Sequence, residues 1–292
     1  MIAENLLDKI GFGAELMKEY QKCEKVLGTR LEPYAKAYMN GEVSIVKALL
    51  DIHKFKNENL SEYTLDLMFI LGCSGFLLEK YKEKGISEDI FIDSMKDIKY
   101  KTIECMKVKG VFGTFVADWY DGFFKLNRIA LGRLQYDIAL KLEKEAEILG
   151  YTISTDDFVL GCHIPSSGPL KHELCLESYR RAYNFFKDRI RDGVLPIVCA
   201  SWLLYPPYKE VFGENSNIMD FVRDFEVLKV EESSNFSDAW RVFDTDYDGD
   251  AGKLSQKTRL QRSFVQYIKD EKPFGAGYGI LLFDGEKVIT RK

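Results

Sequence analysis

Apolar residues recur at intervals of three and four through the first half of the chain, the spacing of one face of an α-helix. The pattern predicts four helices, over residues 4–28, 44–55, 61–85 and 87–110. Ser61 and Ser87 stand at N-cap positions. Glycines close three of these helices after lysine-bearing last turns, at Gly28, Gly85 and Gly110. The first half is therefore expected to be a helical domain.

Beyond about residue 126 the apolar residues gather into short runs bounded by turn residues, a pattern typical of β-strands. Strands are predicted over residues 128–140, 157–164, 194–204, 225–232, 239–244 and 277–284. Helices are predicted between them over residues 169–189, 217–224 and 257–270. This alternation indicates a mixed α/β sheet covered by helices. We expect an α+β protein with a helical domain at 1–126 and a sheet domain at 127–292.

Composition restricts the class of protein. The 292 residues carry a formal net charge of -5, with a pI near 5.5. Nucleic acid and anionic membranes need a basic surface and are not expected as partners. The longest apolar run, residues 67–78, is too short to span a bilayer, and the first residues lack a signal-peptide core. The six cysteines include no C-x-x-C pair, so we expect free thiols, no metal site and a cytoplasmic location.

The segment around His163 is the strongest candidate for chemistry. A predicted strand ends there, because the prolines and glycine of "PSSGP" cannot continue a strand ladder. A helix is predicted to follow, with Ser167 or Gly168 as its cap and Pro169 at its first position. Its unpaired N–H groups and dipole would suit a phosphate, although Pro165 and Pro169 each lack a donor.

His163 would lie at the mouth of such a pocket. A neutral imidazole there can accept a proton from an amine nucleophile. The alternative is a histidine at a strand end that hydrogen bonds to a backbone carbonyl. These residues alone leave both interpretations open.

An acidic loop resembles a calcium site without completing one. Asp244, Asp246, Asp248 and Gly249 match the beginning of an EF-hand loop, but Ser255 occupies the position where a glutamate closes the coordination shell. The preceding segment is also predicted as strand rather than helix. We interpret the segment as a solvated loop.

Three other patterns lack the context that function requires. "GAGYG" (275–279) follows a helix and precedes a strand, the reverse of a dinucleotide loop, and is interpreted as turn or strand-bulge glycines. Cys162 adjoins His163 on one strand, where successive side chains diverge, so it is interpreted as a core thiol. His53 and His172 are expected to be exposed or locally bonded.

Five segments in order resemble a bacterial acyltransferase-domain family: "HIPSSGPL" (163–170), "ASWLLYP" (200–206), "SNIMDF" (216–221), "WRVF" (240–243) and "TRLQRSF" (258–264). Its members join a helical N-acyltransferase N-terminal domain to a GNAT-like C-terminal domain. The resemblance implies a GNAT fold, in which two neighbouring strands splay apart and the pantetheine of acyl-CoA lies in the opening. "DFVLGCHI" would be the first splayed strand, "PSSGPL" the pyrophosphate loop and "PIVCASWLL" the second strand.

The resemblance further implies an enzyme that transfers an acyl group from acyl-CoA to an amine by direct attack. His163 would be the general base and Glu173 a weaker candidate. Tyr205 or Tyr208 would protonate the leaving thiolate, or else only pack against the neighbouring side chains. Asn217 would bond the pantetheine amide, or else cap its own helix. Groups that hold the pyrophosphate would come from the turn, at Ser166, Ser167, Gly168, Leu170 and Lys171. The acceptor would be a small-molecule or protein amine, and the helical domain would cap the cleft or form a homodimer.

Two departures from the family pattern favour a rival hypothesis. The turn keeps only Gly168 of the usual R/Q-x-x-G-x-G/A loop, and the helix after the second strand lacks the tyrosine that many GNAT enzymes carry there. The alternative is a catalytically inactive GNAT-like binding or regulatory protein. A weaker third hypothesis is a calcium-responsive module built on the acidic loop.

Overall fold

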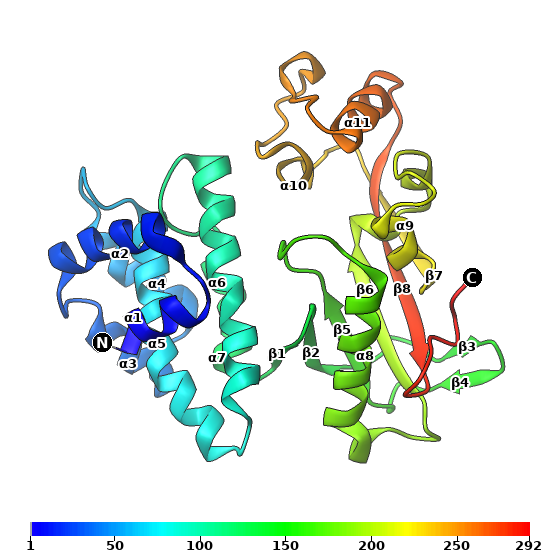
Figure 1. Ribbon diagram of the computed structural model, residues 1–292, viewed down its shortest axis with the longest axis horizontal. Helices are drawn as coiled ribbons and strands as arrows, with labels where there is room; N and C mark the ends of the chain where they lie inside the picture. The colour runs from blue at the N-terminus through cyan, green and yellow to red at the C-terminus, as the bar shows by residue number, and fades with distance from the viewer. Residues whose placement is uncertain (1) are drawn as a thin grey trace. The chain divides into compact units, whose positions relative to one another are not determined.

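The computed structural model describes residues 2–292, which form two compact units (Figure 1). The first unit extends to Ala130 and also includes Pro165–Ser167. The second consists of Leu131–Ile164 and Gly168–Lys292.

The first unit is helical, as predicted. Its α-helices are α1 (Ile2–Lys9), α2 (Gly13–Leu27), α3 (Glu32–Met39), α4 (Ile45–Ile52), α5 (Glu62–Glu83), α6 (Glu88–Lys109) and α7 (Asp121–Phe124). The short 3-10 helices η1 (His53–Phe55) and η2 (Ala117–Tyr120) complete it. The helix α5 packs against α1, α2, α3, α4 and α6, and it is buried around most of its circumference because it forms the centre of this unit.

The helix boundaries follow local signals. Ser61 caps α5, because its Oγ accepts the N–H of Thr64 at 3.0 Å. The single helix predicted over residues 4–28 is wrong, since Gly11, at a φ of 71°, separates α1 from α2. The helix α3 was not predicted, because its eight residues carry a short and weak apolar pattern.

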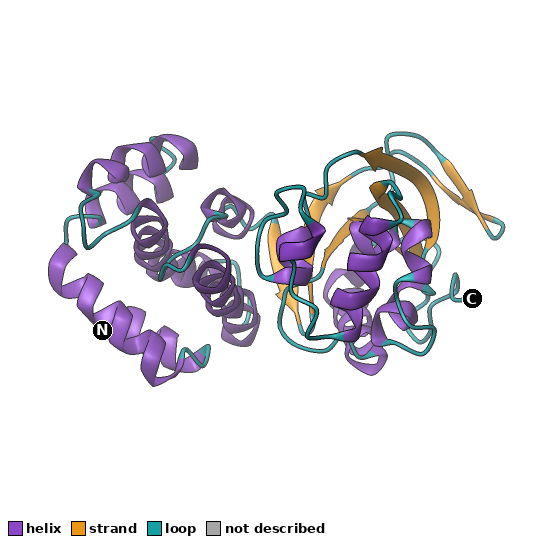
Figure 2. Ribbon diagram, turned by 90° about the horizontal axis from the view of Figure 1, so that it is seen from above, coloured by secondary structure: helices purple, strands orange, loops and turns teal. Residues whose placement is uncertain are grey.

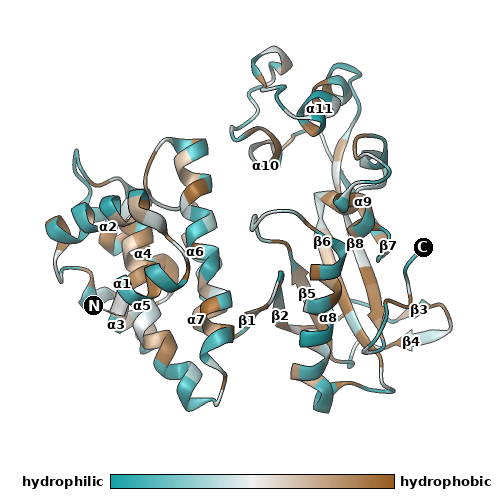
Figure 3. Ribbon diagram, viewed as in Figure 1, coloured by the Kyte–Doolittle hydropathy of each residue, from teal (hydrophilic) through white to brown (hydrophobic). Residues whose placement is uncertain are grey.

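The second unit is built on a mixed sheet. Its strands are β2 (Leu134–Leu140), β5 (Val159–His163), β6 (Leu195–Ser201), β7 (Glu226–Ser233) and β8 (Phe274–Phe283), in the spatial order β2-β5-β6-β8-β7. A separate hairpin joins β3 (Ala146–Ile148) to β4 (Tyr151–Ile153). Figure 2 shows helices beside the curved layer of strands, and Figure 3 shows hydrophobic residues concentrated on β6 and β8.

The helices of this unit are α8 (His172–Phe186), α9 (Asn217–Val222), α10 (Ala239–Phe243) and α11 (Arg259–Lys269). Short 3-10 helices lie between them: η3 (Lys187–Arg189), η4 (Trp202–Leu204), η5 (Pro206–Glu210) and η6 (Ala251–Lys253). The crossover between β5 and β6 contains α8, whose Cys175, Tyr179 and Ala182 are fully buried. This β5-α8-β6 unit positions the candidate site.

Several boundaries differ from the predictions. The strand predicted over 239–244 is the helix α10, because short apolar runs do not distinguish a buried helix from a strand. The strand predicted over 128–140 is interrupted at Gly132, whose φ of 82° makes a turn between β1 (Arg128–Leu131) and β2. The hairpin of β3 and β4 was not predicted.

The strand β5 pairs in parallel with β6 at only two positions. The paired residues are Leu160 with Ile197 and Gly161 with Val198. Beyond them β6 continues to pair with β8 as far as Ser201, while β5 ends at His163, paired with β2. The two central strands therefore separate at their carboxyl ends, as the GNAT resemblance implies.

The glycines of "GAGYG" lie in the body of β8 rather than in a turn. A Cβ at Gly277 would lie 2.2 Å from the carbonyl oxygen of Leu204, and a Cβ at Gly275 would lie 2.6 Å from the ring of Tyr205. Their role is therefore a close backbone approach, which lets η4 and the residue after it cross this face of the strand.

Candidate active site

His163 and Asp137 are in hydrogen-bond contact at the end of β5. The antiparallel register places Asp137 of β2 opposite Gly161, two residues before His163, so both side chains lie on the same face of the sheet. His163 Nε2 lies 2.7 Å from Asp137 Oδ2. The two side chains are 30% and 22% exposed, so both reach solvent. The strand-end histidine is therefore bonded to a carboxylate.

This contact sets the chemistry of the imidazole. A carboxylate at hydrogen-bond distance favours the tautomer with its proton on Nε2, which makes Nδ1 the basic atom. It also stabilises the imidazolium that forms when Nδ1 accepts a proton. The pair can therefore act as a positioned general base.

The turn after β5 is fastened by a buried arginine. Gly168 adopts a φ of 96°, a conformation that favours glycine. Arg133 donates from Nη2 to the carbonyl oxygen of Gly168 at 2.9 Å and from Nε to that of Pro169 at 3.4 Å. Arg133 follows the Gly132 turn and is only 9% exposed. The sequence analysis did not single out Arg133.

The helix α8 begins with an uncapped N-terminus. It starts at His172 with Lys171 at the N-cap position, and no side chain caps it. The prediction that Ser167 or Gly168 would cap this helix, with Pro169 at its first position, is therefore wrong, because Pro169 precedes the first helical residue by three positions. N–H groups in the first turn of a helix have no intrahelical partner and attract anions.

The other residues predicted for the turn have separate environments. Ser166 belongs to the first unit, where its hydroxyl donates to Glu104 Oε1 of α6. Lys101 also pairs with Glu104, at 2.9 Å. Ser167 is half-buried, Leu170 is buried at 6% exposure, and Lys171 is exposed. The hydroxyl of Ser166 is thus engaged by protein.

Tyr205 and Tyr208 are both buried after the end of β6. Tyr205 donates its hydroxyl proton to Glu232 at 2.8 Å, and Tyr208 accepts the N–H of Gly275 at 3.4 Å. Burial raises the pKa of both phenols well above the ordinary value, and the hydrogen bond to Glu232 raises that of Tyr205 further. The ring of Tyr208 also packs among other aromatic rings, including that of Phe264 at 5.0 Å.

Glu173 and Asn217 are exposed at the starts of two helices. Glu173 lies in the first turn of α8. Asn217 is the first residue of α9, but Ser216 caps that helix by accepting the N–H of Met219 at 3.1 Å. Asn217 is therefore not a cap for its own helix.

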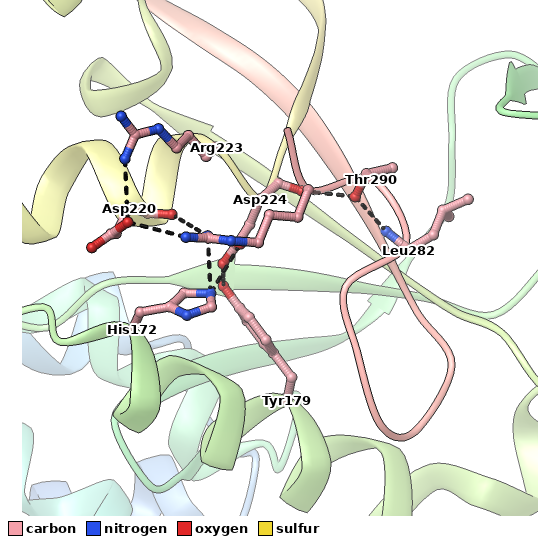
Figure 4. A network of polar contacts seen from close by, with 8 residues as sticks. His172, Tyr179, Asp220, Arg223, Asp224, Leu282 and Thr290 are labelled. Atoms are coloured by element: carbon pink, nitrogen blue, oxygen red, sulfur yellow. Dashed lines mark hydrogen bonds and ion pairs between the residues drawn. The ribbon is translucent and has the colours of Figure 1, made fainter. Parts of the chain in front are cut away.

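A second polar network lies at the start of α8 (Figure 4). Asp224, fully buried, accepts from Arg291 Nη1 at 2.6 Å and from the hydroxyl of Tyr179 at 3.2 Å, and it lies 3.1 Å from His172 Nε2. Burial raises the pKa of Asp224, while the hydrogen bond from Arg291 opposes that shift. Thr290 bonds the carbonyl oxygen of Asp224 at 2.7 Å. These contacts hold the first turn of α8 against the carboxyl-terminal segment.

The patterns set aside in the sequence have structural roles. Cys162 is buried, and its hydrogen bond with Cys199 together with burial raises its thiol pKa, so it stays protonated. His53 Nε2 lies 2.7 Å from Asp66 Oδ1. In the acidic loop, Asp248 pairs with Lys253 at 2.7 Å. Residues 2–292 contain no group of three or more His, Cys, Asp or Glu residues placed to hold a metal ion.

Comparison with protein families identifies both parts of the chain. Residues 1–126 match the N-acyltransferase N-terminal domain, and residues 129–281 match the GNAT-like C-terminal domain. The chain belongs to the family of acyltransferases that combines these two domains, and the resemblance inferred from the sequence is confirmed.

Solved structures share this fold. An acyltransferase in complex with decanoyl-CoA and teicoplanin superposes with a TM-score of 0.70 at 20% identity, covering 95% of this chain and 86% of that chain. A decanoyl-CoA complex of an acyltransferase gives a TM-score of 0.63 at 20% identity, covering 96% and 99%. A complex with CoA and 10C-teicoplanin gives 0.62 at 20% identity, covering 75% of this chain and 66% of that chain.

No curated protein matches the chain significantly in sequence. Within the described part of the chain, no helix has both the length and the hydrophobicity needed to cross a membrane.

Proposed function

We propose that this protein transfers an acyl group from acyl-CoA to the amine of a small-molecule acceptor. The observation that carries the proposal is the contact between His163 and Asp137, at the end of the strand where β5 leaves β6. A histidine that contacts a carboxylate, a strand opening and an anion-attracting helix start all occur at the β5-α8 connection. The structures of similar fold that contain CoA or decanoyl-CoA support acyl-CoA as the donor.

The cofactor would be held by backbone groups more than by side chains. The pyrophosphate would accept hydrogen bonds from the first N–H groups of α8, assisted by the charge of Lys171. The Gly168 turn would be kept in shape by Arg133, which donates to the carbonyl oxygens of Gly168 and Pro169. This arrangement explains how binding can survive a loop that keeps only one glycine of the usual pattern.

His163 would act on the acceptor. As the amine nitrogen attacks the thioester carbonyl carbon, Nδ1 of His163 takes the ammonium proton, and Asp137 stabilises the resulting imidazolium. When the tetrahedral intermediate collapses, the carbon–sulfur bond breaks and the CoA thiolate leaves. The imidazolium then returns its proton to the thiolate, so the step needs no separate acid.

This assignment replaces the role expected of the two tyrosines. A phenol whose pKa is raised by burial releases its proton to a thiolate with difficulty, and Tyr205 directs its proton to Glu232. We therefore propose that Tyr205 and Tyr208 have a structural role, forming part of the wall of the proposed acyl-CoA site just after β6. Glu173, exposed in the first turn of α8, remains the weaker candidate base.

The acceptor is proposed as a small-molecule amine, because teicoplanin occupies the acyltransferase of similar fold that contains decanoyl-CoA. A cytoplasmic location is supported by the cysteines, all six of which are free and buried. A catalytically inactive binding protein is the second candidate, favoured by the engagement of the Ser166 hydroxyl with Glu104.

Two successive measurements test the proposal. The melting temperature is recorded with acetyl-CoA, octanoyl-CoA, decanoyl-CoA and free CoA, since a ligand of the native state raises it. Release of free CoA thiol is then followed with a panel of small amines. We expect a saturable shift with an acyl-CoA and amine-dependent thiol release.

The variant His163→Gln should retain the shift and lose about 100-fold or more in turnover, while Glu173→Gln should retain both. Absence of any shift contradicts acyl-CoA binding. A shift without thiol release across the amine panel supports the inactive binding protein instead.

A further inference from the structure

The second unit contains a cavity outside the β5-α8 connection. Its volume is about 400 Å³, in the range of small-molecule pockets. It lies between the segment that follows η5 and the start of α11, and its lining consists of residues 211–216, Ile218, Arg259 and Leu260. Two of the segments that carry the family resemblance, 216–221 and 258–264, therefore meet at this cavity.

Arg259 supplies a positive charge that no protein group neutralises. Within the described residues its guanidinium has no hydrogen bond or ion pair. Arg262, one turn further along α11, is different, since its Nη1 donates to the carbonyl oxygens of Gln256 and Lys257 at 2.9 and 3.1 Å. The guanidinium of Arg259 is thus available for a ligand, and its planar donors suit a carboxylate.

The fold makes room for this guanidinium. A Cβ placed on Gly213 would lie 2.9 Å from Arg259 Nη1 and 3.1 Å from its Cζ, so the side chain rests directly against the glycine. At the N-terminus of α11, a capping box already occupies the backbone N–H groups of Thr258 and Gln261. Thr258 Oγ1 already accepts the N–H of Gln261 at 3.1 Å in a capping box. The charge of the cavity wall therefore comes from the side chain.

An opposite charge and an apolar surface complete the lining. Glu214 also lines the cavity, and no ion pair joins its carboxylate to Arg259 in the described residues. Apolar side chains form much of the remaining wall, at Val211, Phe212, Ile218 and Leu260. The cavity thus presents one positive charge, on Arg259, and one negative charge, on Glu214, beside apolar side chains. A matching ligand carries one negative and one positive group on an apolar body.

We propose that this cavity binds a small zwitterion with an apolar side chain, its carboxylate on Arg259 and its ammonium on Glu214. The chemical class is that of an apolar α-amino acid or an equivalent amino-carboxylate. The proposal goes beyond the proposed acyl transfer and does not depend on it, because the site is defined by binding alone.

The test is direct binding, measured by calorimetry and by melting temperature with L-phenylalanine and L-leucine as probes. We expect saturable binding in the millimolar range. Arg259→Ala should weaken it about tenfold or more. Arg262→Ala removes a guanidinium from the same helix and should leave the affinity unchanged. Because Arg259 is exposed and unpaired, its replacement should not disturb folding.

Three further arms separate the parts of the site. Gly213→Ala keeps every charge but displaces the guanidinium, and it should weaken binding as Arg259→Ala does. Phenylalanine amide should bind weakly because it lacks the carboxylate, and N-acetylphenylalanine should bind more weakly than phenylalanine because it lacks the ammonium. Absence of saturable binding, or equal affinity in the wild type and Arg259→Ala, overturns the proposal; equal binding of phenylalanine and its N-acetyl derivative overturns the role of Glu214.

Discussion

His163 Nε2 lies 2.7 Å from Asp137 Oδ2, although the two residues are 26 positions apart and belong to different strands. The contact depends on the pairing of β2 with β5, and on Gly161 opposite Asp137. A Cβ at Gly161 would lie 3.3 Å from the Cβ of Asp137 and 2.2 Å from Leu140 Cδ1. The glycine therefore lets the histidine and the aspartate approach one another across the strand pair.

Replacement of Asp137 by Asn should lower turnover more than binding. The amide keeps the size of the carboxylate but cannot stabilise an imidazolium, so we expect kcat to fall by about 10- to 100-fold with little change in the KM for acyl-CoA. Asp156→Asn, at an exposed position, is the control and should be neutral. A raised KM with unchanged kcat would show that Asp137 shapes the acyl-CoA site instead of supporting the base.

Replacement of Arg133 by Lys should affect the KM for acyl-CoA rather than kcat, the reverse of what is expected for Asp137→Asn. Lysine keeps the charge but lacks the rigid, planar arrangement of donors with which the guanidinium reaches both Gly168 and Pro169. The turn should loosen, and the KM for acyl-CoA should rise about tenfold while kcat changes little. Arg180→Lys, on the exposed surface of α8, serves as the matched control. Unchanged KM in Arg133→Lys would refute a role for this arginine in holding the turn.

Asp66 should make the stability of the protein fall as pH rises through mildly acidic values. Burial raises its pKa from 3.8 to about 6, against the opposing effect of the hydrogen bond with His53. Between these two values the folded protein holds a proton that the unfolded chain has released, so the free energy of unfolding decreases with pH across that window, by at most about 3 kcal/mol.

The variant Asp66→Asn should lose this slope, which urea titrations between pH 4 and pH 7 would measure. Asp51→Asn, whose carboxylate pairs with Lys47 on the surface, should keep it. An identical slope in wild type and Asp66→Asn would assign the pH dependence to other groups.

Two glycine-to-alanine changes should have opposite signs. At Gly277 a Cβ would lie 2.2 Å from the carbonyl oxygen and 2.6 Å from the carbonyl carbon of Leu204, so the backbone must move. We expect Gly277→Ala to cost about 2 kcal/mol or more of stability, as overpacking does. Gly72 lies within α5, and its Cβ would meet Ala35 Cβ at an ordinary 3.6 Å. Gly72→Ala should stabilise the protein by about 0.5–1 kcal/mol. Thermal and urea unfolding of both variants would check the signs.

Local signals were sufficient for most of the architecture. Serines at the N-cap positions predicted the starts of α5 and α6, and the change of apolar pattern near residue 126 indicated a helical part followed by a sheet part. Prediction was less successful where the local pattern is short or ambiguous. The segment 239–244 has the composition of a strand, yet tertiary packing makes it the helix α10.

The site was predictable only in part for the same physical reason. His163 could be located because prolines and a glycine end its strand visibly in the sequence. Asp137 and Arg133 were not found, because their roles arise from strand pairing and from a turn that bring distant positions together. Arg259 was not identified either, because it lines a cavity that forms only when distant segments of the chain come together.

The short parallel pairing of β5 with β6 leaves two strand edges facing one another inside the sheet. An exposed edge ordinarily invites another chain to add to it and is a hazard for aggregation. Here each of the two strands is paired on its other side, β5 with β2 and β6 with β8. A thin extended molecule with its own amide groups could still enter the gap and form hydrogen bonds with both strand edges. The interrupted pairing of β5 and β6 would then hold a flexible ligand in an extended conformation and a fixed orientation.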